Sequence, residues 1–235
     1  MSNEPPLQLL TIDLDDTVWP CMPVIQAAEQ ALYAWLEQHV PRLTAVYDRD
    51  SLHAHRKALQ RRMPGIAHDI SAVRLASLRQ LFNTFGYDPA LAEQAFGVFI
   101  RIRNRVRPYR DVAPVLESLA SEFCLISVTN GNAEVACTPL ASQFHHSLNA
   151  AGAGAMKPDP AMFEQALALA GARGEQSLHI GDDPYLDVEA ARRAGLRAVW
   201  MNREGRPWPE ALPRPEAEFQ DFLALYQWLG RACAY

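Results

Sequence analysis

The chain has 235 residues, of which 49% are hydrophobic and 21% are charged, and its formal net charge at pH 7 is −5. This composition is typical of a globular protein and excludes a fibrous one. The acidic balance disfavours a nucleic-acid partner, and the lack of an apolar run of about 18 residues disfavours a membrane partner.

The first residues contain Glu4 and two prolines instead of the cations and apolar stretch of a signal peptide. We therefore expect a cytoplasmic protein. In that compartment thiols stay reduced, and we expect them to be mostly buried. The four cysteines are Cys21, Cys124, Cys137 and Cys233.

The N-terminal part of the chain changes from strand to helix. Residues 7–14 form a short apolar run, which is typical of a strand buried on both faces. Pro20 and Pro23 indicate a stiff connection rather than an element. From Val24 to Val106, apolar residues recur at three- and four-residue steps, which predicts about four helices and no strand.

From Pro108 onward, helical and strand patterns alternate. We expect helices at 112–121, 161–170, 186–194 and 222–229, and strands at 123–129, 178–181 and 197–201. Alternation of this kind indicates parallel strands joined by helical crossovers. The sequence therefore predicts an α/β fold, a doubly wound parallel sheet built from 1–19 and 108–235, with a helical bundle at 20–107 inserted as a second domain.

Polar residues follow the expected strands. Asp13 and Asp15 follow the first strand, Thr129 ends the second, and Asp182 follows a third. In open parallel sheets, ligands bind beyond the carboxyl ends of the strands. Carboxylates that converge there repel one another, and a divalent cation relieves that repulsion. Hard oxygen ligands of this kind favour Mg²⁺ together with a phosphate-bearing substrate.

Four segments match, in order, the four motifs of the haloacid dehalogenase-like hydrolases. They are Asp13-Leu14-Asp15-Asp16-Thr17, Ser127-Val128-Thr129-Asn130-Gly131, Met156-Lys157-Pro158 and Gly181-Asp182-Asp183-Pro184-Tyr185-Leu186-Asp187. The resemblance covers essentially the whole chain, including a helical cap inserted after the first motif. It implies a phosphatase with a Rossmann-like core.

The resemblance also implies roles for individual residues. Asp13 would be the nucleophile that forms an aspartyl-phosphate. Asp15 would protonate the leaving alkoxide and then activate water, while its backbone carbonyl binds Mg²⁺. Asp13 and Asp182 would supply carboxylate ligands to the same ion.

Phosphate binding falls to the second and third motifs. Thr129 would donate its hydroxyl to the phosphoryl oxygens, aided by backbone N–H groups at a helix start after Asn130. Lys157 would balance the charge on the nucleophile and the phosphoryl group. Asp183 and Asp187 are expected to contact the residues that bind the metal ion, and not the ion itself.

Further segments resemble the bacterial phosphatases that act on flavin mononucleotide and on the phosphoribitylamino-uracil intermediate of riboflavin synthesis. These segments are 65–70 with Arg74, 129–133 and 179–183. The resemblance makes His68, Asp69 and Arg74 candidates for substrate specificity, although His68 and Asp69 are equally suited to capping the helix that follows.

Other functions stay open at this point. The loop at 150–156 is rich in Gly and Ala where a more polar loop is expected, so a general sugar-phosphate or nucleotide phosphatase is the main alternative. A haloacid dehalogenase would not require Asp15. A phosphomutase or a non-catalytic module that binds phosphorylated ligands would use the same fold. A small phosphorylated metabolite is the expected partner, and the chain is expected to be a monomer or a homodimer.

Overall fold

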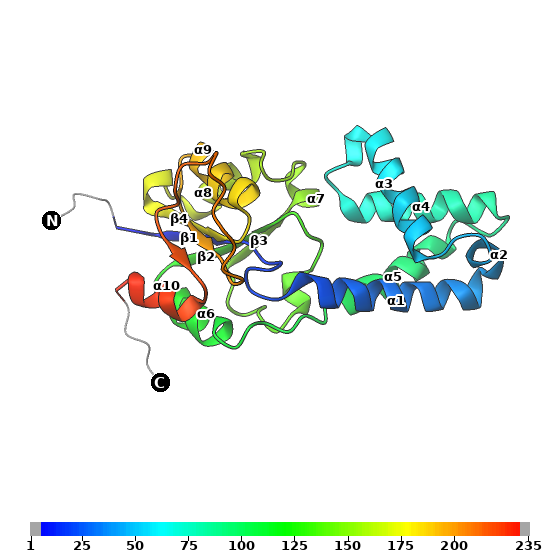
Figure 1. Cartoon of the computed structure of the whole chain (residues 1–235), viewed down its shortest axis with the longest axis horizontal. Helices are drawn as coiled ribbons and strands as arrows, with labels where there is room; N and C mark the ends of the chain where they lie inside the picture. Colours follow the sequence, from blue (N-terminus) through cyan, green and yellow to red (C-terminus); the bar gives the residue numbers. More distant parts are fainter. Residues whose placement is uncertain (1–5, 231–235) are drawn as a thin grey trace. The chain divides into compact units, whose positions relative to one another are not determined.

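The computed structural model describes residues 6–230, which form two compact units (Figure 1). The first comprises the described residues of Met1–Pro20, Arg107–Gly131 and Val135–Tyr235. The second comprises Cys21–Val106 and Asn132–Glu134, so a short piece of the second-motif loop belongs to the helical unit. Within 6–230, no helix is both long enough and apolar enough to cross a membrane.

The first unit is built on a six-stranded parallel sheet with the order β3-β2-β1-β4-β5-β6. The strands are β1 (Leu9–Ile12), β2 (Cys124–Thr129), β3 (His146–Asn149), β4 (Ser177–Gly181), β5 (Arg197–Met201) and β6 (Glu218–Phe219). Strand β1 lies between β2 and β4, and every residue of β1 is buried, as its apolar run predicts. The order reverses on either side of β1, which confirms the doubly wound sheet.

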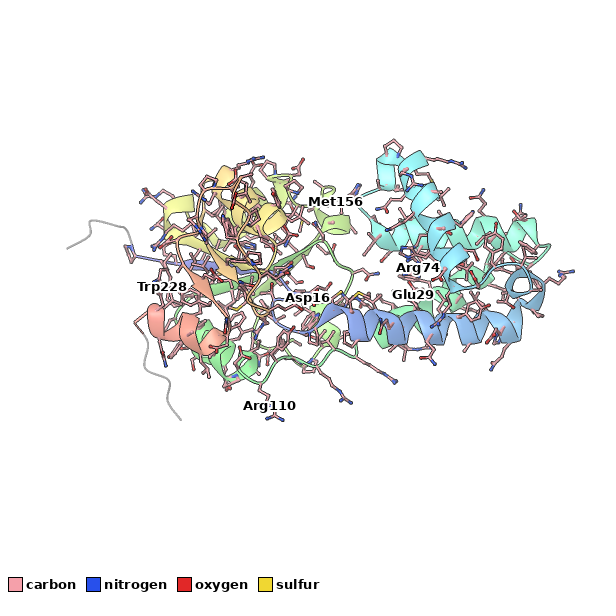
Figure 2. The ribbon with its side chains drawn as sticks, in the orientation of Figure 1. Asp16, Glu29, Arg74, Arg110, Met156 and Trp228 are labelled. Atoms are coloured by element: carbon pink, nitrogen blue, oxygen red, sulfur yellow. The ribbon has the colours of Figure 1, made fainter. Side chains whose placement is uncertain are left out.

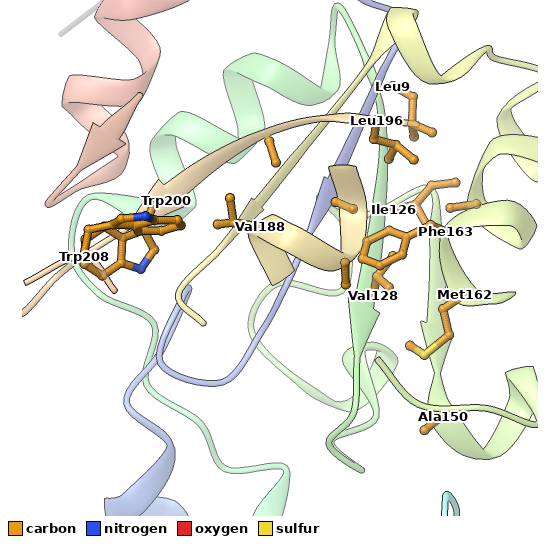
Figure 3. Close-up of a cluster of buried hydrophobic side chains, with 14 residues drawn as sticks. Leu9, Ile126, Val128, Ala150, Met162, Phe163, Val188, Leu196, Trp200 and Trp208 are labelled. Atoms are coloured by element: carbon orange, nitrogen blue, oxygen red, sulfur yellow. The ribbon is translucent and has the colours of Figure 1, made fainter. Parts of the chain in front are cut away.

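Helices cover both faces of this sheet (Figure 1). They are α6 (Val112–Ala120), α7 (Ala150–Ala153), α8 (Ala161–Ala170), α9 (Ala190–Arg193) and α10 (Phe222–Trp228), with short helical turns η2 (Val135–Cys137), η3 (Gly174–Gln176) and η4 (Pro184–Glu189). Phe163 and Met162 of α8 pack with Ile126 and Val128 of β2 in one buried cluster (Figure 3). Helices α6 and α10 lie on the opposite face.

The second unit is entirely helical. It contains α1 (Cys21–His39), α2 (Pro41–Thr44), α3 (Arg49–Arg62), η1 (Pro64–Ile66), α4 (Ile70–Thr84) and α5 (Leu91–Arg103). Its buried cluster joins α1, α4 and α5 through residues such as Leu36, Phe82 and Phe99. Gly86 has a φ of 70°, a left-handed conformation that suits a glycine just beyond the end of α4.

Three expectations need correction. The segment from Pro20 to Pro23 is not merely a connection, because α1 begins at Cys21; proline is tolerated in a first helical turn, where its missing N–H has no partner to lose. Strand β3 was not expected, since it is short, polar and only partly buried. The thiols are not mostly buried: Cys137 is exposed and Cys21 is half-buried, while Cys233 lies outside the described residues.

Candidate active site

Three strands bring predicted site residues to one edge of the sheet. Asp13 follows β1, and its backbone N–H donates to the carbonyl of Ile180 on β4 at 2.9 Å. Thr129 is the last residue of β2, and Asp182 follows β4. Asp13 and Thr129 are 6% and 2% exposed. The carboxyl ends of parallel strands therefore converge here as expected.

Lys157 is the centre of the buried polar network. Its Nζ donates to Oδ1 of Asp13 at 2.6 Å, to Oδ1 of Asp187 at 2.5 Å and to the carbonyl of Val128 at 2.8 Å. The Asn130 side chain holds the Lys157 backbone on both sides: its Nδ2 donates to the Lys157 carbonyl (2.9 Å), and its Oδ1 accepts from the Lys157 N–H (2.7 Å). These bonds place the ammonium although Lys157 follows no strand.

The Asp187 carboxylate is held by two further contacts. Its Oδ2 accepts the backbone N–H of Asp183 at 2.9 Å, and its Oδ1 lies 3.3 Å from Nε2 of His179. The other ring nitrogen of His179 lies 2.9 Å from the hydroxyl of Thr11. A Cβ on Gly181 would stand only 2.4 Å from Cγ of Asp187, so this approach requires glycine.

Burial and charge set the protonation of this network. Burial raises the pKa of Asp13, and the Lys157 ammonium offsets this only in part. Burial also acts to raise the pKa of Asp187, but the charge of Lys157 and the hydrogen bond with His179 outweigh it and hold that pKa well below its usual range. Asp13 and Asp187 together keep the pKa of Lys157 above its ordinary value despite burial. Lys157 and Asp187 therefore form a fixed ion pair, and the charge of Asp13 is only partly balanced.

Three carboxylates form a cluster that fits a divalent cation. One oxygen each from Asp13, Asp182 and Asp187 lie within 4.8 Å of one another. Burial, followed by the charges of Asp187 and Asp16, raises the pKa of Asp182 to about 7. Carboxylates that repel one another this strongly, with oxygen donors only, suit Mg²⁺. Asp187 belongs to this cluster, whereas the side chain of Asp15 lies outside it.

Asp15 sits in the tight turn that leaves β1. The indole Nε1 of Trp19 donates to its Oδ1 at 2.9 Å, and Trp19 is completely buried. Between them, Asp16 adopts a left-handed φ of 60°, and its N–H donates to the Trp19 carbonyl at 2.7 Å. The turn therefore fixes the orientation of the Asp15 carboxylate.

Two contacts at the site were not expected from the sequence. The Thr17 hydroxyl lies 3.3 Å from Oδ2 of Asp13 and 3.4 Å from Oδ1 of Asp182. The Arg206 guanidinium donates to the carbonyl and to Oδ2 of Asp182 at 3.1 and 3.2 Å. Thr17 stands inside the first motif, so its hydroxyl was a usable signal. Arg206 belongs to a proline-rich loop that carries no such signal.

The second-motif loop differs from expectation. No helix starts after Asn130; the chain bends there, and the 3₁₀ turn η2 begins only at Val135. The expected helix-start N–H groups are therefore absent from residues 130–134 of the described chain. Instead, the N–H of Gly131 donates to the Thr129 hydroxyl at 2.9 Å.

The three candidate specificity residues in the helical unit have different surroundings. Asp69 caps α4 by accepting the N–H groups of Ser71 and Ala72. His68 is half-buried in the turn before that helix. Arg74 is 7% exposed, and its guanidinium stacks 3.6 Å above the ring of Phe99.

Comparison with known proteins gives consistent matches over most of the chain. The haloacid dehalogenase-like hydrolase family matches residues 7–195. The chain is 31% identical to the 5-amino-6-(5-phospho-D-ribitylamino)uracil phosphatase YigB of Escherichia coli, over 84% of each chain. It is also 31% identical to a phosphoserine phosphatase of Thermus thermophilus, covering 88% of this chain and 94% of the relative. A crystal structure of a 2-haloacid dehalogenase from Pseudomonas syringae superposes with a TM-score of 0.90 at 38% identity, covering 95% of this chain and 98% of the other.

Proposed function

Because the chain belongs to the haloacid dehalogenase-like hydrolases, as a phosphatase of that family, we propose that it hydrolyses small phosphomonoesters through an aspartyl-phosphate on Asp13. The observation that carries this proposal is the buried Lys157 ammonium between Asp13 and Asp187. The ammonium orients the Asp13 carboxylate and partly neutralises it, at the edge of the sheet where ligands bind.

The chain's own residues carry the transferred proton and phosphoryl group. Asp13 attacks phosphorus, so that a P–O bond to its carboxylate forms while the bond to the leaving oxygen breaks. Asp15 gives its proton to that oxygen, and the alcohol leaves. Asp15 then takes a proton from water, which attacks the same phosphorus and releases inorganic phosphate and free Asp13. Lys157 and Thr129 stabilise the charge on the phosphoryl oxygens.

Magnesium is the cofactor that this site suits. Asp13 and Asp182 would hold it, with the Asp15 carbonyl completing the protein ligands as the family pattern implies. Asp187 is better placed to hold Lys157, its partner at 2.5 Å, and Asp183 to cap η4, where its side chain accepts the N–H groups of Tyr185 and Leu186. When bound, Mg²⁺ shields the negative charge shared by the phosphate and the carboxylates.

The proposed substrate class rests on the family resemblance and on the similarity to YigB. The helical unit, residues 20–107, would act as a cap that selects the leaving group, with Arg74, His68 and Asp69 as the candidate residues. The likeness to YigB makes a ribityl phosphate, including flavin mononucleotide, the first substrate to test. A sugar phosphate or a nucleotide is the alternative.

A dehalogenase is the second candidate, because the Pseudomonas syringae structure that superposes at a TM-score of 0.90 is named as one. Dehalogenation of a 2-haloacid also uses an aspartate nucleophile, but it expels halide, which needs no proton. Asp15, and Asp182 of the three-carboxylate cluster, would then have no task. Both features therefore favour the phosphatase.

One experiment separates the two candidates. Purified protein is assayed for phosphate release from a panel of phosphomonoesters and for halide release from 2-chloropropionate, with Mg²⁺ or with excess chelator. We expect Mg²⁺-dependent phosphate release only, and its loss by more than about 1,000-fold in Asp13→Asn. Asp159→Asn is the matched control, because the Asp159 side chain accepts the Ala161 N–H at the start of α8 and an Asn oxygen accepts it equally well. Halide release that persists with chelator would contradict the proposal.

A further inference from the structure

The helical unit contains a cavity of about 480 Å³ that lies wholly within it. The lining comes from α1, α3, α4, α5 and Asn132. This volume falls in the range of pockets that bind small molecules, about 300–1,000 Å³. Asn132 is also tied to α4, because its Nδ2 donates to the Ser71 hydroxyl at 3.0 Å.

One wall of the cavity is a cationic face of α3. Arg49, His53, Arg56, Lys57 and Gln60 line it together with the acidic Asp50, at spacings of three and four residues plus two adjacent pairs, which place them on one side of the helix. Helix α3 has no buried residue. Its packing therefore does not explain why basic residues gather on this side.

The charges around the cavity do not balance. Four basic residues line it, but only Glu29 and Asp50 are acidic. Glu29 is shared, because Arg74 holds both of its oxygens at 2.7 and 3.1 Å while Arg56 approaches Oε1 at 3.1 Å (Figure 2). Burial lowers the pKa of Arg74 only to about 10, so Arg74 stays charged at neutral pH. Two guanidiniums thus share one carboxylate in a half-buried setting, which favours an additional anion.

The lining also contains apolar side chains, beside the polar Gln26 and Asn132. Ile25 and Met22 of α1, Ile70 of α4 and Phe99 of α5 contribute to it. The Phe99 ring is covered by the Arg74 guanidinium, which keeps that cation in place. The cavity therefore offers carbon contacts beside an excess of positive charge.

We propose that this cavity binds the second anionic group, a carboxylate or a further phosphate, of a substrate that carries two. Arg56, Arg49 and Lys57 make the contacts, and Arg74 with Glu29 orients Arg56. This inference rests on the proposed phosphatase function and narrows its substrate class. In the chain, Asn132 of the lining follows Thr129 of the second motif by three residues.

The test compares substrate pairs that differ in the second anion. The pairs are 3-phosphoglycerate with glycerol 3-phosphate, and fructose 1,6-bisphosphate with fructose 6-phosphate. In the double variant Arg49→Gln/Lys57→Gln, we expect KM to rise about ten-fold for 3-phosphoglycerate and fructose 1,6-bisphosphate. The KM for glycerol 3-phosphate and fructose 6-phosphate, and kcat for all four compounds, should stay within about two-fold of the parent. A response in only one pair identifies the anion as carboxylate or phosphate.

The control is Arg61→Gln/Arg62→Gln, which removes the same charge from exposed positions of α3 outside the lining. We expect KM in this variant to stay within about two-fold of the parent for every substrate. Equal KM changes in both double variants, or equal changes for both members of each pair, would overturn the inference.

A binding measurement separates failure of this inference from failure of the proposed function. If the protein hydrolyses no phosphomonoester, the proposed function is wrong. Calorimetry of the same four compounds with Asp13→Asn then decides the cavity: tighter binding of the members with a second anion, lost in Arg49→Gln/Lys57→Gln, supports it, and equal binding within each pair overturns it.

Discussion

Trp19 is a buried residue that orients the side chain of Asp15. Its indole N–H donates to one oxygen of the carboxylate of Asp15, the proposed general acid. Because Trp19 is completely buried, the indole cannot rotate away without disturbing its packing. The Asp15 carboxylate is therefore oriented before any substrate binds, as the proposed general acid requires.

This orientation leads to a prediction for Trp19→Phe, which keeps an aromatic ring but removes the donor. We expect kcat on an alkyl phosphate to fall by about ten-fold or more, because its leaving oxygen needs a proton. The activated 4-nitrophenyl phosphate, whose leaving group needs none, should be affected by less than about three-fold.

Steady-state kinetics on both substrates checks this prediction, with Trp228→Phe as the control because Trp228 is 40% exposed on α10. An equal fall on both substrates would show that Trp19 serves packing alone.

Gly181 is the second residue on which the site depends. In Gly181→Ala, the new methyl would meet Asp187, so the carboxylate that holds Lys157 must move. We expect the free energy of unfolding to fall by about 1–3 kcal/mol and kcat to fall with it. Denaturant unfolding and kinetics measure both. Gly97→Ala is the control: its Cβ would have no neighbour within 4 Å, and alanine favours the interior of α5. A fully stable, fully active Gly181→Ala would refute the close approach.

At the scale of elements, the pairing of Glu29 with Arg74 joins α1 to α4 (Figure 2). Burial acts to raise the pKa of Glu29, but the hydrogen bonds and charge of Arg74 outweigh it, so the pKa lies below its ordinary value. A carboxyl group whose pKa is lower in the folded state stabilises the protein above its unfolded pKa, about 4.3 for Glu. That stabilisation is lost as the pH falls through the folded pKa.

The pH dependence of unfolding tests this link between helices. We expect Glu29→Gln to have a lower Tm than the parent at pH 7, and a smaller further loss between about pH 5 and pH 3. Thermal unfolding followed by circular dichroism provides the measurement. Glu37→Gln, at an exposed position on the same helix, is the control. If Tm fell equally in Glu29→Gln and in the parent as the pH is lowered, this contribution of Glu29 to stability would be ruled out.

At the scale of the whole molecule, two units with separate buried clusters share one chain. The carboxylate cluster belongs to the sheet unit alone. A cation bound there stabilises the folded state of that unit by mass action, by about 2.7 kcal/mol at a concentration 100 times its Kd.

We therefore expect saturating Mg²⁺ to raise the Tm of the sheet unit by about 5 °C or more. In Asp182→Asn, one ligand and part of the carboxylate repulsion are removed, so the shift should shrink to below about 2 °C. Scanning calorimetry with Mg²⁺ and with chelator resolves the effect, and Na⁺ at equal ionic strength is the control. An identical shift in parent and variant would place the ion elsewhere.

The sequence by itself determined the parts of the fold that depend on local pattern. Short apolar runs predicted β1, β2, β4 and β5, because a strand buried on both faces admits few polar residues. The order of strands and helices predicted the parallel sheet, and carboxylates placed directly after buried strands predicted where Asp13 and Asp182 would meet. Strand β3 and helix α3 left no such pattern, because neither buries an apolar face.

Only the tertiary structure decided which charges share a partner. Lys157 joins Asp13 and Asp187, which stand 144 and 30 residues away from it in the chain. Arg206 reaches Asp182 from a loop, and Arg74 takes Glu29 as its partner 45 residues away. The physical reason is that periodicity reports burial, a property of each segment, whereas the partner of a charged side chain depends on how distant segments close around it.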